Sequence, residues 1–578
     1  MKIHSRIVNC ACYAAVAAVA VYLTAHYSAY VYKFHALSMF EGSWDWFAAH
    51  FDRPAALLTW CGRLFTQICC RPALAIALLM LLLAATVRLI RRFIICDSRF
   101  GALSILPATL MLLFVMRLGY NIYILKSDAL IFTQPIGLLC ALCLFRLLIS
   151  TPGGILKPLL VAIIAFPLFG FYSLLALLMF GFRALVRGGG GRSVAAAAVS
   201  LASAAAVPYL WYLVAFNGTN PDYLWLYGLP YPDISGLWDI AWPLAAALAL
   251  PLLLCLIPFR YKDHASQWLS AAVAVLSAAV AIPALYILPC RDSLFHRQIK
   301  AERCIEAGDW DGVLKQTAMS DVTNDIIVAY RNIALFRKGQ LVEKCCDYSF
   351  DCVPVYVNGN QMVSSRLAGP TIFFHSGLVN FASRWAFELN LGNAYALERI
   401  KYLAKCALIN GEYDLAAKYI DAVGRNPFQH RWARRYRTIV SNPGSISDDP
   451  ELAPIRELNR YSQKFWLASD KAANNVPAFY LYMDNACDTP EFLEWAMASA
   501  MMTKTQNHFE DLYSAYAAAF PEMPESVRQA RMVFAVVSED SQRIGTVQKD
   551  FGGSVNINPD DRLNYAHYYY QKRYAEPF

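Results

Sequence analysis

The sequence predicts an all-α protein: a polytopic bundle of transmembrane helices followed by a soluble α-helical domain of tetratricopeptide-like repeats. Hydrophobic residues make up 57% of the 578 residues and charged residues only 16%, whereas about 25% of residues are charged in ordinary soluble domains. The apolar residues are concentrated in residues 1–290, in runs long enough to cross a bilayer. Helical patterns separated by short glycine turns fill the remainder, as in helical-repeat domains.

Charge is divided between the two halves in the same way. Residues 1–290 contain 19 Lys+Arg and 9 Asp+Glu, a net charge of +10. Subtracting these from the whole-chain totals of 51 and 43 leaves 32 and 34, a net charge of −2, for residues 291–578. The basic excess therefore lies in the short loops of the apolar half, which is typical of membrane orientation. We expect the lipid bilayer as a partner and no nucleic acid.

Nine membrane segments are predicted in residues 1–290. The first apolar run, 7–30, is not followed by a convincing cleavage site, and we expect it to remain as a membrane helix. Pro158–Phe182 is interrupted at Pro167 and Gly170, so we predict two short half-spans that turn at residues 166–171. The other six spans are predicted at 72–90, 101–116, 129–148, 194–216, 237–259 and 267–288.

The alternative for 158–182 is one tilted span, and the positions of the basic residues decide against it. With the N-terminus in the cytoplasm, a single span would place Arg183, Arg187 and Arg192 outside, against the positive-inside tendency. Two half-spans keep them inside and place the C-terminal half in the periplasm. The internal loops then contain Arg88, Arg91, Arg92, Arg99, Arg146, Lys157, Arg183, Arg187, Arg192, Arg260 and Lys262.

The first external loop, residues 32–71, has two amphipathic patterns. Phe40, Trp44, Phe47 and Phe51 recur at spacings of 4, 3 and 4, which puts four rings on one helical face. After Arg53-Pro54 the same spacing is repeated by apolar residues. Two short helices along the membrane surface explain both patterns. Their polar faces would carry Glu41, Asp45, Asp52, Arg53, Arg63 and Gln67.

These polar residues have two interpretations. They are either the solvated faces of interfacial helices or an external catalytic site. In the second case, Asp45 and Asp52 are the catalytic carboxylates that deprotonate or orient an acceptor, and Arg53 and Arg63 bind the departing phosphate of a lipid-linked sugar. Convergence of the two carboxylates with Asp222 and Asp233 on one cavity would favour an enzyme.

Residues 291–440 are predicted to form the tetratricopeptide-like domain. Three turns there look like one turn used again, with glycines at Gly308, Gly339 and Gly411. The glycines are 31 and 72 residues apart, and the second gap is close to two units of about 34 residues. Residues 347–376 are predicted to be an inserted loop. Residues 441–578 are predicted to continue as helices without a clear repeat.

The second half contains few groups that indicate chemistry. Cys352 is close to Cys345 and Cys346 in sequence, so a disulfide with one of them is one interpretation in an oxidising compartment; buried free thiols are the other. The basic run Arg431–Arg437 is either a contact surface or a solvated helix face. The cysteines and histidines do not cluster at zinc-finger spacing, so no metal and no cofactor is expected.

Four segments carry a family resemblance: Arg53–Leu57, Gly62–Gln67, Ser383–Glu388 and Leu408–Tyr413. They resemble an uncharacterised family of the Bacteroidota, whose members pair a multi-span N-terminal region with a tetratricopeptide-like C-terminal region. The resemblance implies the inner membrane of a Gram-negative cell and no activity. The overall plan is also similar to that of GT-C glycosyltransferases, but the first loop lacks an adjacent acidic pair.

The sequence therefore predicts an integral inner-membrane protein that displays a periplasmic helical-repeat domain. We expect a scaffold that recruits a protein partner in envelope assembly, because repeat arrays commonly present surfaces to partner proteins. A GT-C-like glycosyltransferase with a lipid-linked sugar donor is the alternative. A transporter is a second alternative, although ionisable residues within the spans are scarce.

Overall fold

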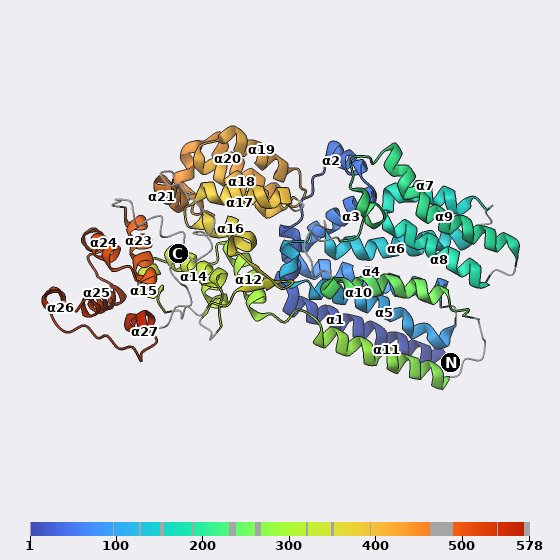
Figure 1. Ribbon diagram of the computed structural model, residues 1–578, viewed down its shortest axis with the longest axis horizontal. Helices are drawn as coiled ribbons and strands as arrows, with labels where there is room; N and C mark the ends of the chain where they lie inside the picture. The colour runs from blue at the N-terminus through green and yellow to red at the C-terminus, as the bar shows by residue number, and fades with distance from the viewer. Residues whose placement is uncertain are drawn as a thin grey trace. The chain divides into compact units, whose positions relative to one another are not determined.

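The computed structural model describes residues 2–95, 97–125, 129–150, 155–187, 190–230, 238–259, 267–318, 322–347, 352–392, 395–462, 489–539 and 541–570. It divides into two compact units. Unit 1 comprises Met1–Asp292 with the short segments Gly392–Leu397 and Arg425–His430, and unit 2 comprises the remainder. The described elements are helical except for the hairpin of β1 (Val355–Val357) and β2 (Asn360–Met362) (Figure 1). The predicted all-α class is confirmed.

Nine helices of unit 1 coincide with the predicted membrane segments. By length and composition, five described segments can cross a membrane: Pro72–Phe93, Arg99–Arg117, Leu130–Ser150, Gly191–Val214 and Trp268–Ile287. These findings are compatible with a membrane protein. The nine helices are α1 (Lys2–Ala36), α4 (Pro72–Phe93), α5 (Ile105–Arg117), α6 (Leu130–Ser150), α7 (Lys157–Phe169), α8 (Phe171–Arg187), α9 (Gly191–Val214), α10 (Trp238–Cys255) and α11 (Gln267–Ile287).

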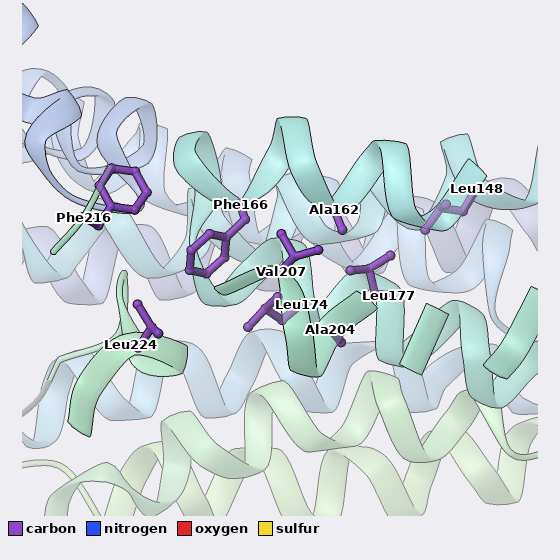
Figure 2. Packing of buried hydrophobic residues seen from close by; sticks show 9 residues of the cluster. All are labelled: Leu148, Ala162, Phe166, Leu174, Leu177, Ala204, Val207, Phe216 and Leu224. Carbon is purple, nitrogen blue, oxygen red and sulfur yellow. The ribbon is translucent and has the colours of Figure 1, made fainter. Parts of the chain in front are cut away.

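Residues 158–182 form two helices rather than one. Helix α7 ends at Gly170, whose φ of +54° and ψ of −130° lie in a region that only glycine adopts readily. The amide of Phe171 donates to the carbonyl of Tyr227 at 2.8 Å, so a distant loop satisfies the backbone where the helix breaks. Figure 2 shows α7 and α8 running in opposite directions over a shared apolar cluster. The cluster contains Leu148, Ala162, Phe166, Leu174, Leu177, Ala204, Val207, Phe216 and Leu224.

Basic side chains join the carboxyl ends of α4, α6 and α8 at one end of unit 1, which we call the basic end. Arg183 of α8 donates to the carbonyl of Phe93 of α4 at 2.6 Å and lies 5.5 Å from the ring of Phe145 of α6. Lys157 donates to the carbonyl of Leu147 at 2.7 Å. Such bonds satisfy carbonyls that a helix terminus leaves without intrahelical partners. Arg183 is therefore at the same end of the unit as Lys157, which begins α7.

The opposite end of unit 1 is marked by contacts of α1, α5, α10 and α11. The hydroxyl of Tyr30 in α1 donates to the carbonyl of Val115 at 2.6 Å. The amide of Cys290, just after α11, donates to the carbonyl of Met116 at 3.0 Å. Arg117 at the end of α5 lies 5.8 Å from the ring of Trp242 near the start of α10. The helices thus alternate in direction between the two ends.

Unit 2 contains paired helices followed by a further helical region. The first pairs are α12 (Ser293–Ala307) with α13 (Trp310–Gln316), α14 (Asp325–Arg337) with α15 (Leu341–Lys344), α16 (Ser364–His375) with α17 (Val379–Gly392), and α18 (Leu397–Asn410) with α19 (Tyr413–Gly424). The remaining described α-helices are α20 (His430–Ser441), α21 (Leu452–Ser462), α23 (Pro490–Thr503), α24 (Gln506–Ala519), α25 (Glu525–Val537), α26 (Ser541–Asp550) and α27 (Tyr565–Tyr570).

One glycine turn joins the helices in each of these four pairs. Its glycine has a positive φ, as at Gly308 (+71°) and Gly411 (+80°). The glycine amide donates to the carbonyl three residues back, and the next amide to the carbonyl five residues back, which is the Schellman motif. The fourth copy is at Gly377, between Gly339 and Gly411. It divides the long gap of 72 residues into 38 and 34, so a further helix pair with the same turn lies between Gly339 and Gly411.

The prediction that residues 347–376 form an inserted loop is wrong for most of its described part. The β1–β2 hairpin and α16 lie within it. Gly369 and Pro370 suggested a loop, but both are buried inside α16. An ideal Cβ on Gly369 would lie 3.3 Å from Cγ of Trp385. Tight packing of α16 against α17 therefore offsets the hydrogen bond that Pro370 removes from the helix.

Candidate functional site

The first loop of unit 1 contains two helical stretches. These are α2 (Trp44–Ala49) with the 3₁₀ turn η1 (His50–Asp52), and α3 (Ala56–Thr66) with η2 (Gln67–Cys70). Ser43 caps α2 by accepting the amide of Trp46 at 3.4 Å. Helix α1 continues to Ala36, so residues 32–36 are helical and the predicted loop begins later. The break between the stretches is at Ala55, which follows Pro54 and has a φ of +66°.

The aromatic residues of the loop do not share one exposed face. Phe40 precedes α2 and is 3% exposed, whereas Trp44 is 75% exposed. The ring of Trp60 in α3 contacts two of the four rings: Phe47 lies 5.3 Å and Phe40 5.6 Å from it between centroids. The prediction of a single four-ring face is therefore wrong, because the helix begins only at Trp44. The rings instead pack α2 against α3.

The four predicted site residues lie in different environments. Asp45, Asp52 and Arg53 are exposed. Arg63 is only 7% exposed, and its guanidinium lies 5.2 Å from the ring of Trp46. The prediction that Arg63 shares a solvated polar face with the carboxylates is therefore wrong, because α3 turns this side towards α2. Asp222, in η5 (Pro221–Leu226), is also exposed, and Asp233 lies outside the described residues.

Gln67 was expected on the same solvated face but is fully buried. Its amide nitrogen donates to the carbonyl of Ser38 at 3.1 Å, and its amide oxygen accepts from Asn426 at 2.8 Å. Nearby, Gln429 and His35 form a hydrogen bond of 3.0 Å through Nε2 of each side chain. Buried amides are costly unless they are paired, so these bonds fix the segment Arg425–His430 in unit 1.

Backbone and ionic contacts hold the two short segments in place as well. The amide of Gly42 donates to the carbonyl of Arg425 at 3.1 Å, and that of Met39 to the carbonyl of Tyr395 at 3.1 Å. Arg425 also donates to the carboxylate of Glu41 at 3.0 Å. Residues 38–42, which follow α1, are thus covered by parts of the chain more than 350 positions away. No local sequence signal indicates these contacts.

A buried ionic cluster in unit 2 was not predicted. Its centre is Glu451, which accepts from Lys405 at 2.6 Å and from the hydroxyl of Tyr436 at 2.5 Å. Arg337 donates to the backbone carbonyl of Glu451 at 3.0 Å. These residues come from α14, α18, α20 and the turn before α21, and we call them, together with His375 of α16, the Glu451 cluster. It connects the first helices of successive pairs with α20 and α21.

Electrostatics within the Glu451 cluster follow from burial and charge. Burial alone raises the pKa of Glu451, but the charges of Lys405 and His375 and the hydrogen bonds from Lys405 and Tyr436 together outweigh it and lower the pKa to about 2. Burial lowers the pKa of His375 to about 3, and the nearby Arg337 lowers it further. Burial also lowers the pKa of Arg337 to about 10. At neutral pH the cluster holds a charged Glu451 between cations and a neutral His375, an arrangement that suits a structural clasp.

The structure forms no disulfide at the predicted residues Cys345, Cys346 and Cys352. Sγ of Cys345 lies 3.5 Å from Sγ of Cys346, and burial raises the pKa of Cys346 well above its usual value. Cys352 is near the start of α14, where its thiol forms a hydrogen bond with Asp325. The close thiol pair is thus made of the two adjacent cysteines and does not include Cys352.

The basic run Arg431–Arg437 forms much of α20. Ala433 and Tyr436 are buried, Arg435 pairs with Asp449 at 2.7 Å, and Arg437 pairs with Asp421 at 2.6 Å. Arg431 and Arg434 are exposed. Among the described residues, no group of three or more His, Cys, Asp or Glu side chains is placed to hold a metal ion.

Comparison with known proteins yields one match. DUF6057, a family of unknown function, matches residues 2–574, nearly the whole chain. No curated protein and no solved structure matches the chain. The match covers both units and supplies no activity for either.

Proposed function

The chain belongs to the DUF6057 family of unknown function, and we propose that it is a scaffold of the bacterial inner membrane. In this proposal, seven of the nine helices of unit 1 span the membrane, α7 and α8 enter it as two half-spans, and the N-terminus lies in the cytoplasm. Unit 2, a tetratricopeptide-like array, faces the periplasm and recruits a protein partner in envelope assembly. The observation that carries the proposal is the filled first loop, where Gln67 and His35 are paired with Asn426 and Gln429.

The filled loop favours a scaffold over an enzyme for a physical reason. A catalytic carboxylate needs an oriented neighbour and a partly desolvated site to act on substrate. Asp45 and Asp52 are exposed, whereas the buried polar groups of the loop hold two distant segments of the chain. The buried polar residues Gln67 and His35 therefore have a structural role, because they hold Asn426 and Gln429 within unit 1.

The proposed topology is supported by the position of Arg183. It binds the carbonyl of Phe93, so it lies at the basic end, beside Arg146 and the end of α4. A single span over 158–182 would separate Arg183 from Arg146 by the thickness of the membrane. Basic residues gather on the cytoplasmic side, which assigns the basic end to the cytoplasm and leaves the end of α11 in the periplasm.

Reporter fusions test the topology. Alkaline phosphatase fused after Phe578 should be active, because it folds only in an oxidising compartment. The same reporter inserted in the loop between α8 and α9 should be inactive. Activity at the loop and none after Phe578 would contradict the proposed orientation.

The recruiting role is tested by crosslinking in living cells. The exposed pair Arg431 and Arg434 is the proposed contact, and it suits a partner with an acidic surface. A photo-crosslinking residue at either position should capture one defined protein, and the same residue at Arg88 should not. Charge reversal at both arginines should lose the capture and the function of the gene together.

A GT-C-like glycosyltransferase with a lipid-linked sugar donor is the second proposal, and the position of Asp45 and Asp52 in the first loop of unit 1 favours it, although their exposure does not. The variants Asp45→Asn and Asp52→Asn separate the two proposals. Both should restore a deletion strain fully if the protein is a scaffold. Loss of a glycan with either variant, at unchanged protein level, would favour the enzyme.

A further inference from the structure

The exposed face of α4 changes from apolar to basic along its length. Leu74, Ala77, Leu81 and Ala84 are exposed at helical spacing, and Leu74 and Leu81 are more than half exposed. The same stripe continues into Arg88 and Arg91, which are also exposed. A stripe of this kind matches a phospholipid, whose acyl chain lies along apolar side chains and whose headgroup reaches cations at the membrane surface.

Three guanidinium groups gather where this stripe ends. Arg92 and Arg146 lie 5.7 and 5.0 Å from the ring of Phe93, on α4 and α6 respectively. Arg183 of α8 binds the carbonyl of Phe93 and lies over Phe145. The rings of Phe93 and Phe145 therefore bring together guanidinium groups from α4, α6 and α8.

Few carboxylates lie near this group in the sequence. The sequence from 72 to 187 contains only two carboxylates, Asp97 and Asp128. Asp97 pairs with Arg99 at 2.6 Å, and Asp128 lies outside the described residues. Within the described part of the chain, Arg146 forms no ion pair. Cations held this close repel one another unless an anion lies between them.

The partial negative charge of the helix ends is already compensated in part. The carboxyl ends of α4 and α6 attract cations. Two side chains already bind carbonyls there: Arg183 donates to Phe93, and Lys157 donates to Leu147 and Leu148. Arg146 takes part in none of these three hydrogen bonds. Arg146 is exposed, and so are the neighbouring Leu147 and Cys143, so this cation lies beside exposed apolar side chains.

We propose that the basic end binds the headgroup of an anionic phospholipid between α4 and α6. Arg92 and Arg146 contact the phosphate, and an acyl chain lies along the part of the stripe nearest to them, at Leu81 and Ala84. Arginine suits this role because its planar fork binds phosphate oxygens in pairs. The apolar stripe next to the cations distinguishes a lipid from a free phosphate, which needs no such surface. The site is independent of any protein partner of unit 2.

Purified full-length protein in detergent tests the site. Phosphatidylglycerol is added at increasing mole fraction, and the midpoint of thermal unfolding is measured, because a ligand that binds the folded state raises it. Phosphatidylcholine and inorganic phosphate are the two comparison ligands. The variants are Arg92→Gln and Arg146→Gln, singly and together. Arg117→Gln is the matched control, since Arg117 also lies over a ring, that of Trp242, but at the opposite end.

Phosphatidylglycerol should stabilise the wild type and Arg117→Gln equally. The double variant should require about tenfold more lipid for the same shift, the effect of about 1.4 kcal/mol of lost binding. Equal shifts in all proteins, or equal shifts with phosphatidylcholine, would overturn the proposal. An equal shift with inorganic phosphate would show a free-anion site instead of a lipid site.

If the double variant does not fold, Arg146→Lys replaces it. That variant keeps the charge and loses the paired geometry, and native mass spectrometry counts the lipid that stays bound. Retention of phosphatidylglycerol by the wild type and loss from Arg146→Lys supports the site. Equal retention by both overturns it.

Discussion

The helix break at Gly170 in unit 1 and the glycine turns of unit 2 use the same residue in different ways. At Gly308, Gly339 and Gly411, the amides after the helix bond to carbonyls of that same helix, and a Cβ would meet no atom within 4 Å. At Gly170, the following amide bonds to Tyr227, and a Cβ would collide with Tyr227 and approach Ala55. The turns of unit 2 are closed locally, whereas the break in unit 1 is closed by distant residues.

This difference explains what each glycine contributes. A local turn needs only a residue with a positive φ. Replacing its glycine therefore costs backbone strain. A break in an apolar helix exposes amides and carbonyls that lipid cannot satisfy. Gly170 must therefore also allow another backbone to approach closely. Long-range contacts are then expected to carry more stability than local ones in both units, and four experiments test this.

The largest effect is expected at the Glu451 cluster, a long-range contact within unit 2. Glu451→Ala leaves Lys405 buried without its carboxylate, which costs about 3–5 kcal/mol of unfolding free energy. Asp421→Ala is the control, because its pair with Arg437 is about half exposed and such pairs contribute about 0–1 kcal/mol. Denaturant unfolding of the purified protein measures both. Equal effects would mean that unit 2 is held mainly by its local turns.

The second effect is at Gly170. Gly170→Ala should lower the free energy of unfolding by about 2–4 kcal/mol, since it combines backbone strain of about 1–3 kcal/mol with overpacking. Thermal unfolding in detergent, with a probe in unit 1, measures the change. A variant as stable as the wild type would show that the backbone at Tyr227 can move away from the added Cβ at little cost.

The third effect concerns pH. Burial raises the pKa of Glu494 to about 7, although the amide of Leu341 donates to its carboxylate at 3.1 Å. The unfolded pKa is near its ordinary value of about 4.3, so the folded state binds the proton more tightly. Stability from this group is complete below the unfolded pKa and is lost as pH rises through 7, by about 3–4 kcal/mol in total and about 2–3 kcal/mol between pH 5 and pH 8.

Unfolding of the wild type and of Glu494→Gln at pH 5 and pH 8 checks this prediction. The wild type should lose more stability than the variant between the two values. The same slope in both proteins would assign the pH dependence to other groups. The range from pH 5 to pH 8 lies well above the pKa of Glu451, about 2. Glu451 therefore does not titrate in the range where Glu494 does.

The smallest effect is expected at the local turns. Gly411→Ala should cost about 1 kcal/mol, the price of a positive φ at a residue with a Cβ, because space is open around it. Gly308→Ala should cost the same. Thermal unfolding measures both, and a loss as large as that of Gly170→Ala would remove the distinction between local and distant closure.

Much of the fold could be predicted because its signals are local. A membrane helix is an apolar run of sufficient length, and a Schellman turn is a glycine with two bonds back into its own helix. The break near Gly170 was indicated by Pro167 and Gly170 and by the arginines that follow. The fourth turn, at Gly377, was missed because Pro370 and its neighbours imitate a loop, although the packing of α16 sustains a helix there.

The polar residues of the candidate site also depend on contacts that are not local, and these could not be predicted. Helical spacing placed Arg63 and Gln67 on a solvated face, but α2 covers the first and Asn426 the second. The Glu451 cluster has no sequence signal, because its members come from five separate elements. Asp45 and Asp52 are exposed as expected, and their role remains a prediction that the asparagine variants test.

The sequence by itself determined the division into an apolar half and a more polar half, the helical class, the basic excess of the first half and the positions of three glycine turns. Each depends on composition or on bonds that close within a few residues. The tertiary structure decided which charges are buried, which cations share Phe93, and which loop satisfies the amide after Gly170. Those outcomes depend on segments tens to hundreds of residues apart, and periodicity carries no information about which of them meet.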